Sequence, residues 1–267
     1  MINCRYFNKI NNTCSYEVAD GCYEVFNCTH FKGNQKGIRT ENFSSDVFFV
    51  PWIGKNYEKG FFNCKRTLIL GNSFYCDFSK LEGQYEECKK NNRCMKREYY
   101  RCCSYGIECL SLEFKDMSRA HKHLMGILAG MDYHDTSLPE ATESIRQSIA
   151  FYNFIQEALD TGSDKPTKEQ CIRSDSAFFE VLEKLRPEII IALGTSHMWT
   201  DLPGDEGRYH DRWEWRKPFE YENFSLNQGS YSLNDGQKIP ILLVKHPSRN
   251  YEPILWNSII NKWVNSL

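Results

Sequence analysis

Three short segments of the sequence carry side chains that could act together on a flat, polar ligand. Gly71 to Tyr75 (GNSFY) follows one apolar run, Asn153 lies in a second, and His246 to Arg249 (HPSR) follows a third. An imidazole can donate a hydrogen bond to an anion, and a carboxamide offers one acceptor and two donors to the edge of a ligand. Aromatic rings such as those that close the first segment can stack on a flat ring system. Together these residue types could bind a heterocycle and stabilise negative charge on it.

The apolar runs predict the strands that would position these segments. Three runs are short, rich in Ile, Leu and Val, and stopped by glycine or a polar turn, as buried parallel strands are. These runs are 66–70, 189–193 and 241–244. Helical spacing covers three further stretches, the second of them capped by Ser174. These stretches are 144–158, 175–185 and 252–264, whereas 213–216 is expected to be a loop.

Strands that alternate with helices along the chain predict an α/β fold. The expected architecture is a three-layer α/β/α sandwich with a mainly parallel central sheet. In such sheets, ligands bind at the carboxyl ends of the strands, so the segments that follow the strands carry the functional information.

The order of these blocks resembles the uracil-DNA glycosylase superfamily over roughly residues 60–265. The strongest parts of the resemblance are Leu68-Ile69-Leu70-Gly71 and Val244-Lys245-His246-Pro247-Ser248. In that family a strand ends in a glycine loop with the water-activating residue, an apolar block ends in an asparagine that reads the base, and a last strand ends in His-Pro-Ser. The resemblance implies a DNA glycosylase that hydrolyses the N-glycosidic bond of a flipped uracil, damaged or modified base.

The resemblance also gives individual residues their roles. His246 would stabilise the departing base, and Asn153 would read the edge of that base. The remaining substrate-binding residues would form the pocket, stack on the flipped base or hold the backbone phosphate. These residues are Gly71, Phe74, Tyr75, Ser248 and Arg249.

The loop after the first strand departs from the family pattern. Uracil-excising members read Gly-Gln-Asp-Pro-Tyr there, with Asp as the water activator, whereas this chain has Ser73 at the Asp position. We therefore expect Asn72 and Ser73 to be the catalytic residues of the loop, with Asn72 positioning water as in some mismatch-specific relatives. Asp77 is a nearby alternative, and a bulky or modified base becomes a reasonable substrate.

Two other functions stay open. A non-catalytic module that binds DNA or a nucleotide would keep the pocket and would not need the missing Asp. The sequence Leu70-Gly71-Asn72-Ser73 also resembles the Gly-Asp-Ser loop of SGNH-type esterases, in which Ser73 would be the nucleophile. The activating Asp-x-x-His pair of those enzymes is missing, because Leu243 lies three residues before His246.

Eleven of the twelve cysteines fall in the first 109 residues, which favours metal binding in a reducing compartment. The first set, C-x9-C-x7-C-x5-C, could bind zinc or an iron–sulfur cluster, although the proposed chemistry requires neither. Its members are Cys4, Cys14, Cys22 and Cys28. A second set could bind metal instead or share ligands with the first, or all of these residues could be small buried hydrophobes. That set is Cys88, Cys94, Cys102, Cys103 and Cys109.

The cysteines divide the chain into a cysteine-rich segment, 1–45, and a glycosylase-like α/β domain, 46–267, with a cysteine-rich basic insertion at about 77–122. In this insertion Lys89, Lys90 and Arg93 are expected to contact DNA, although a solvated helix face would look the same. The net charge of −2 argues against sequence-blind coating of nucleic acid.

The 267 residues are enough for a full hydrophobic core. Mean hydropathy is −0.58, and no apolar run approaches the ~18 residues of a membrane span. The first residues lack the apolar core of a signal peptide. We expect a soluble, cytoplasmic monomer whose partner is DNA.

Overall fold

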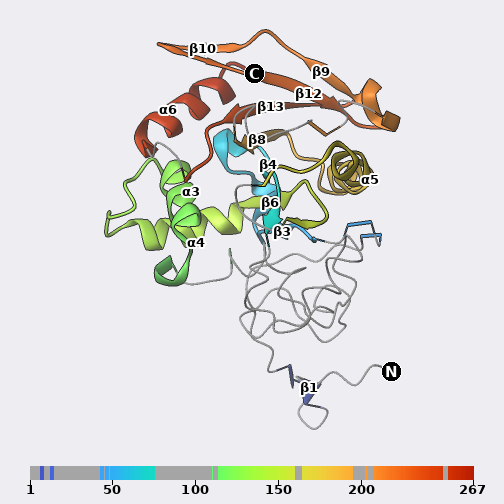
Figure 1. The fold of residues 1–267 in the computed structure, drawn as a ribbon. Coiled ribbons are helices and arrows are strands. Elements are labelled where there is room, and N and C mark those ends of the chain that lie inside the picture. The colour runs from blue at the N-terminus through green and yellow to red at the C-terminus, as the bar shows by residue number, and fades with distance from the viewer. Residues whose placement is uncertain are drawn as a thin grey trace.

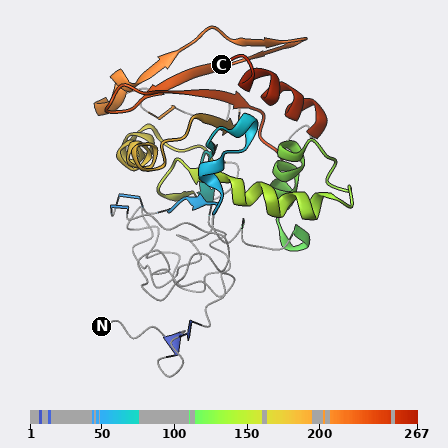
Figure 2. The same cartoon turned by 180° about the vertical axis from the view of Figure 1, so that it is seen from behind.

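The computed structural model describes residues 7–8, 13–14, 43–44, 46–47, 49–75, 110, 114–159, 164–194, 202–203, 207–248 and 252–267. Within these ranges the chain has a mixed α/β fold with a seven-stranded sheet and four α-helices, shown from opposite sides in Figures 1 and 2. No helix in the described ranges is both long and apolar enough to span a bilayer.

The main sheet has the strand order β3-β6-β4-β8-β13-β12-β9. In that order the strands are β3 (Trp52–Ile53), β6 (Ile149–Asn153), β4 (Thr67–Gly71), β8 (Ile189–Leu193), β13 (Lys238–Val244), β12 (Gln228–Ser232) and β9 (Trp213–Trp215). The four strands from β6 to β13 are mutually parallel, and β3, β12 and β9 join them in antiparallel pairings. The α/β class is confirmed, but the sheet is mixed, because the turn between β12 and β13 is too short for the crossover that parallel neighbours need.

Apolar residues on successive positions of the central strands face two different cores. Leu68 and Leu70 of β4 belong to the cluster that includes residues of α5 (Lys168–Leu185). Ile69, which points to the other face, belongs to the cluster built with α3 (Arg119–Ala129), α4 (Leu138–Ser148) and α6 (Pro253–Val264). Figure 1 shows α5 on one side of the sheet and the other three helices across from it. Burial on both faces explains why these strands read as unbroken apolar runs.

Three expectations about local structure were wrong. The predicted helix 144–158 is the end of α4, which stops at Ser148, followed by strand β6. The spacing of the apolar residues in this stretch predicted a helix wrongly. A strand buried on both faces has no period-2 pattern, so its apolar residues also fit one face of a helix. The predicted loop 213–216 contains strand β9. Helix α5 begins seven residues earlier than expected, with a capping box between Thr167 and Gln170, and Ser174 lies inside it.

Three two-stranded pairings complete the described part of the fold. β1 (Phe7–Asn8) pairs with β2 (Thr13–Cys14), and β10 (Phe219–Tyr221) pairs with β11 (Phe224–Leu226), both antiparallel. β5 (Phe74–Tyr75) pairs in parallel with β7 (Ala158–Leu159). Most of segment 1–45 and of insertion 77–122 lies outside the described residues. The end of that insertion is described, and there α3 is part of the main fold.

Candidate functional site at the carboxyl edge of the sheet

The three predicted segments follow strands that end at one edge of the sheet. β4 ends at Gly71, β6 ends at Asn153, and these two residues are register partners. β13 ends at Val244, and because it runs parallel to β8 and β4, His246 follows it at the same edge. After β4 the chain crosses to one side to form β6, whereas after β8 it crosses to the other side to form β13. This edge therefore contains a topological switch point, where ligands of open α/β sheets bind.

The side chain of Asn153 lies directly over Gly71. A Cβ atom at Gly71 would overlap Oδ1 of Asn153 and would lie 3.5 Å from Cζ of Phe151. Asn153 is only 6% exposed, yet its carboxamide makes no hydrogen bond to any residue in the described ranges. Neither polar atom of the carboxamide is among the fully buried unpaired atoms of the described residues, so solvent or a ligand can reach this group and supply its hydrogen bonds.

The segments after β4 and β6 stay together beyond the sheet. The backbone N–H of Phe154 donates to Gly71 O (3.0 Å), and that of Ile155 donates to Asn72 O (2.8 Å). Asn72 is buried and Ser73 is partly exposed in this loop. Two further register pairs, between β5 and β7, follow along both segments. The geometry of Asn153 is therefore fixed from the side of β4 as well as from its own strand.

The predicted aromatic residues have different surroundings. The ring of Phe74 packs on Phe49 with centroids 4.7 Å apart and is 8% exposed, so it belongs to the core below the loop. The backbone of Tyr75 lies in β5, but its side chain is outside the described part of the structure.

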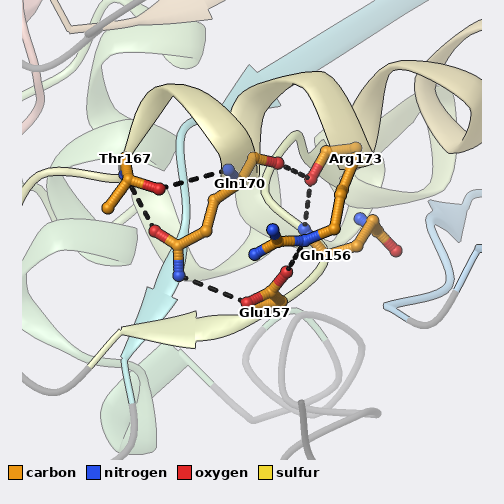
Figure 3. Close-up of polar contacts among 6 residues, drawn as sticks. Gln156, Glu157, Thr167, Gln170 and Arg173 are labelled. Atoms are coloured by element: carbon orange, nitrogen blue, oxygen red, sulfur yellow. Dashed lines mark hydrogen bonds and ion pairs between the residues drawn. The ribbon is translucent and has the colours of Figure 1, made fainter. Parts of the chain in front are cut away.

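The segment that follows Asn153 is anchored on α5 by buried and partly buried polar contacts (Figure 3). The backbone N–H of Gln156 donates to Ser174 Oγ (3.0 Å), and Gln156 Nε2 donates to the carbonyl oxygen of Asn153 (3.0 Å). The next residue, Glu157, accepts from Arg173 Nε (2.8 Å) and from Gln170 Nε2 (3.3 Å). Because several of these groups are buried, each lost partner would leave an unsatisfied polar atom. The network holds the chain at the point where it leaves β6.

The turn after β13 fixes the tautomer of His246. The backbone N–H of Ser248 donates to Nδ1 of His246 (3.2 Å), and Ser248 Oγ lies 2.7 Å from the same atom. A backbone N–H can only donate, so Nδ1 is the acceptor and neutral His246 carries its proton on Nε2. Ser248, which was predicted to hold a phosphate, is exposed and contacts His246 here.

The start of helix α3 links the two halves of the site. His121 Nδ1 lies 2.7 Å from Oγ of Ser118, which caps the helix, and its ring centroid lies 6.1 Å from that of Phe151. Two residues later, His123 Nδ1 lies 2.9 Å from the carbonyl oxygen of Pro247. One turn of helix therefore reaches both the Phe151 side of the site and the turn that carries His246.

Sequence reasoning assigned no role to His121 and His123, because nothing in the sequence links residue 121 to residue 246. The sequence signal that could have pointed to these two histidines lies in the helix that contains them. Ser118 is a helix-capping residue, and both histidines follow it within the first turns of an amphipathic helix.

Burial, and secondarily the nearby imidazole of His246, lower the pKa of His121 from 6.5 to about 4. His121 is therefore neutral at pH 7.

This low pKa predicts a loss of stability in mild acid. The unfolded chain takes up a proton at residue 121 as the pH falls through 6.5, whereas the folded chain does so only near pH 4. The folded state therefore loses roughly 2–3 kcal/mol from this group between pH 7 and pH 4. The free energy of unfolding, measured in urea, should fall by that much more in the wild type than in His121→Gln. Equal losses in the two proteins would show that His121 titrates normally, and His134→Gln, at an exposed histidine, controls for the loss of an imidazole.

Several predicted residues lie outside the described part of the structure. They are Arg249, Asp77, the basic residues Lys89, Lys90 and Arg93, the first-set cysteines Cys4, Cys22 and Cys28, and the whole second cysteine set. Cys14 is described only by its backbone, in β2. Among the described residues, Cys64 is an exposed free thiol, and no three His, Cys, Asp or Glu side chains are grouped to hold a metal ion. The metal and DNA contacts of these residues stay predictions.

Comparison with known proteins adds no family assignment: no protein-family model matches the chain, and no curated protein matches it.

Proposed function

We propose that the chain is a DNA glycosylase-like enzyme that hydrolyses the N-glycosidic bond of a flipped uracil, damaged or modified base in DNA. One observation carries the proposal. The carboxamide of Asn153, which makes no hydrogen bond to a described residue, lies over Gly71 at the sheet edge that also holds His246. A nucleobase would supply hydrogen bonds to the carboxamide and accept one from the imidazole.

In the proposed reaction the bond between C1′ and the base nitrogen breaks, and its electron pair leaves with the base. His246, protonated on Nε2, would donate a hydrogen bond to the negative charge that develops on the base. Asn153 would hold the edge of the base, and the Asn72–Ser73 loop would place the water that adds to C1′. The proton that this water loses would pass to the departing base, which leaves as a neutral free base. A site shielded from bulk water strengthens each of these interactions.

The second candidate, a DNA- or nucleotide-binding module without catalysis, is favoured by one specific observation. The loop 71–75 contains no carboxylate, so none of its side chains is a strong base for activating water. The esterase alternative has less support. In the described structure, Ser73 makes no hydrogen bond to a histidine, and Nδ1 of His246 accepts from Ser248 instead of donating to a carboxylate.

Several other features belong to the same proposal. We infer a three-layer α/β/α arrangement for the domain, supported by the two hydrophobic clusters on opposite faces of the sheet.

DNA would be the partner of a monomeric protein in the cytoplasm, with Lys89, Lys90 and Arg93 contributing to affinity. The N-terminal cysteines, from Cys4 to Cys28, would hold zinc or an iron–sulfur cluster in a structural role.

The proposal is tested with a panel of DNA duplexes and single strands that carry uracil, mismatches or modified bases. The full chain should release a free base from at least one of them and leave an alkali-labile abasic site. Binding to the DNA with no base released from any member of the panel would favour the non-catalytic module.

A further inference from the structure

The peptide bond between Pro247 and Ser248 connects two histidines. His123, in α3, is 2% exposed, and its Nδ1 lies 2.9 Å from the carbonyl oxygen of Pro247. A carbonyl oxygen only accepts, so Nδ1 of His123 carries a proton. The N–H of the same peptide unit, which belongs to Ser248, donates to Nδ1 of His246 (3.2 Å). The hydrogen bonds therefore run from one imidazole through a single peptide group to the other.

We propose that His123 is a positioning residue: through the 247–248 peptide it fixes the orientation and the tautomer of His246. The donor on the oxygen side holds the plane of the peptide so that its N–H points at the His246 ring. A peptide whose oxygen accepts a hydrogen bond is polarised, and its N–H becomes a stronger donor. Both effects favour the His246 tautomer with its proton on Nε2.

The two ends of this chain of hydrogen bonds differ in burial. His123 is held in the core, where its ring centroid lies 4.9 Å from that of Tyr133, and its helix is anchored by contacts with α4 and α6. His246 and Ser248 lie in a turn that is partly open to solvent. The buried histidine therefore gives a rigid reference point to an exposed turn, as a buried hydrogen-bonded partner does for an active-site residue.

Two matched substitutions separate this role from packing. In His123→Asn, the side-chain amide can still donate a hydrogen bond from near the position of Nδ1, whereas in His123→Leu the donor is absent and an apolar side chain remains. The readout is ¹⁵N NMR of the histidine rings in the full chain, which distinguishes the two neutral tautomers. We expect His246 to carry its proton on Nε2 in the wild type and in His123→Asn, and to become a mixture of tautomers in His123→Leu.

The catalytic consequence rests on the proposed function, but the tautomer does not. If a base is excised, His123→Leu should lower kcat roughly tenfold with little change in KM, and His123→Asn should restore most of the loss. A His246 tautomer that is the same in all three proteins overturns the inference, as does a wild-type proton on Nδ1. A tautomer that shifts as expected in a chain that excises no base supports the inference and counts against the glycosylase function.

Discussion

Replacing His246 by alanine is expected to lower kcat for base excision roughly 100- to 1,000-fold. The reason is that Nε2–H of His246 would be the donor to the base as it leaves with the electron pair of the broken bond. That interaction is stronger in the transition state than in the ground state, so its loss affects kcat more than DNA affinity. The measurement is single-turnover excision with the best substrate of the panel, together with a Kd for the same DNA.

Two comparisons make this result specific. His134→Ala removes an exposed histidine that lies outside the site and should excise at the wild-type rate. His246→Gln keeps a donor but changes its position, so it should fall between the wild type and the alanine variant. Unchanged excision by His246→Ala would show that another residue stabilises the leaving base.

A methyl group at Gly71 is expected to lower excision roughly 100-fold while leaving most of the stability in place. The atom that a Cβ at Gly71 would overlap is Oδ1 of Asn153, at the end of a side chain, and no backbone atom lies as close. The carboxamide must therefore rotate or shift, which costs less than moving backbone but misplaces the group that would read the base. The free energy of unfolding should fall by about 1–3 kcal/mol.

A double-mutant cycle tests that explanation. If Gly71→Ala acts through Asn153, it should have little further effect on stability or excision in an Asn153→Gly background. Gly54→Ala provides a contrast, because a Cβ there would overlap backbone atoms of Gln147, and it should lower stability more. Equal effects of Gly71→Ala with and without the Asn153 side chain would contradict the explanation.

The strands that frame the site could be predicted from the sequence, but one of them was assigned to the wrong class. The apolar runs 66–70, 189–193 and 241–244 were expected to be strands. They lie in strands Thr67–Gly71, Ile189–Leu193 and Lys238–Val244, the last of which begins three residues earlier than expected. Ile149–Asn153 was read as helix, because a helix precedes it without a break and its buried residues show no alternation. The resemblance predicts that Asn153 ends an apolar block, and the structure places it at the end of strand β6, where a helix was expected.

The neighbours of His246 were harder to predict than the residue itself. Ser248 is close in sequence, but His121 and His123 come from a helix more than a hundred residues earlier. Their proximity results from the packing of α3 beside the carboxyl edge of the sheet, and a single sequence contains no direct record of that packing. The hydrogen bond from the backbone N–H of Gln156 to Ser174 Oγ was not predicted for the same reason. Ser174 had been assigned to a helix cap.

In the proposed function, Gly71, Asn153 and His246 line one slot for a nucleobase. The most direct test is an NMR titration of the full chain with free uracil, thymine, cytosine and hypoxanthine in turn. We expect at least one base to shift the NMR signals of the Gly71 backbone N–H, the Asn153 carboxamide and the His246 ring nitrogens together, with one shared Kd. If the three sets of signals follow different dissociation constants, or if no base moves them, the residues do not form a common base-binding site.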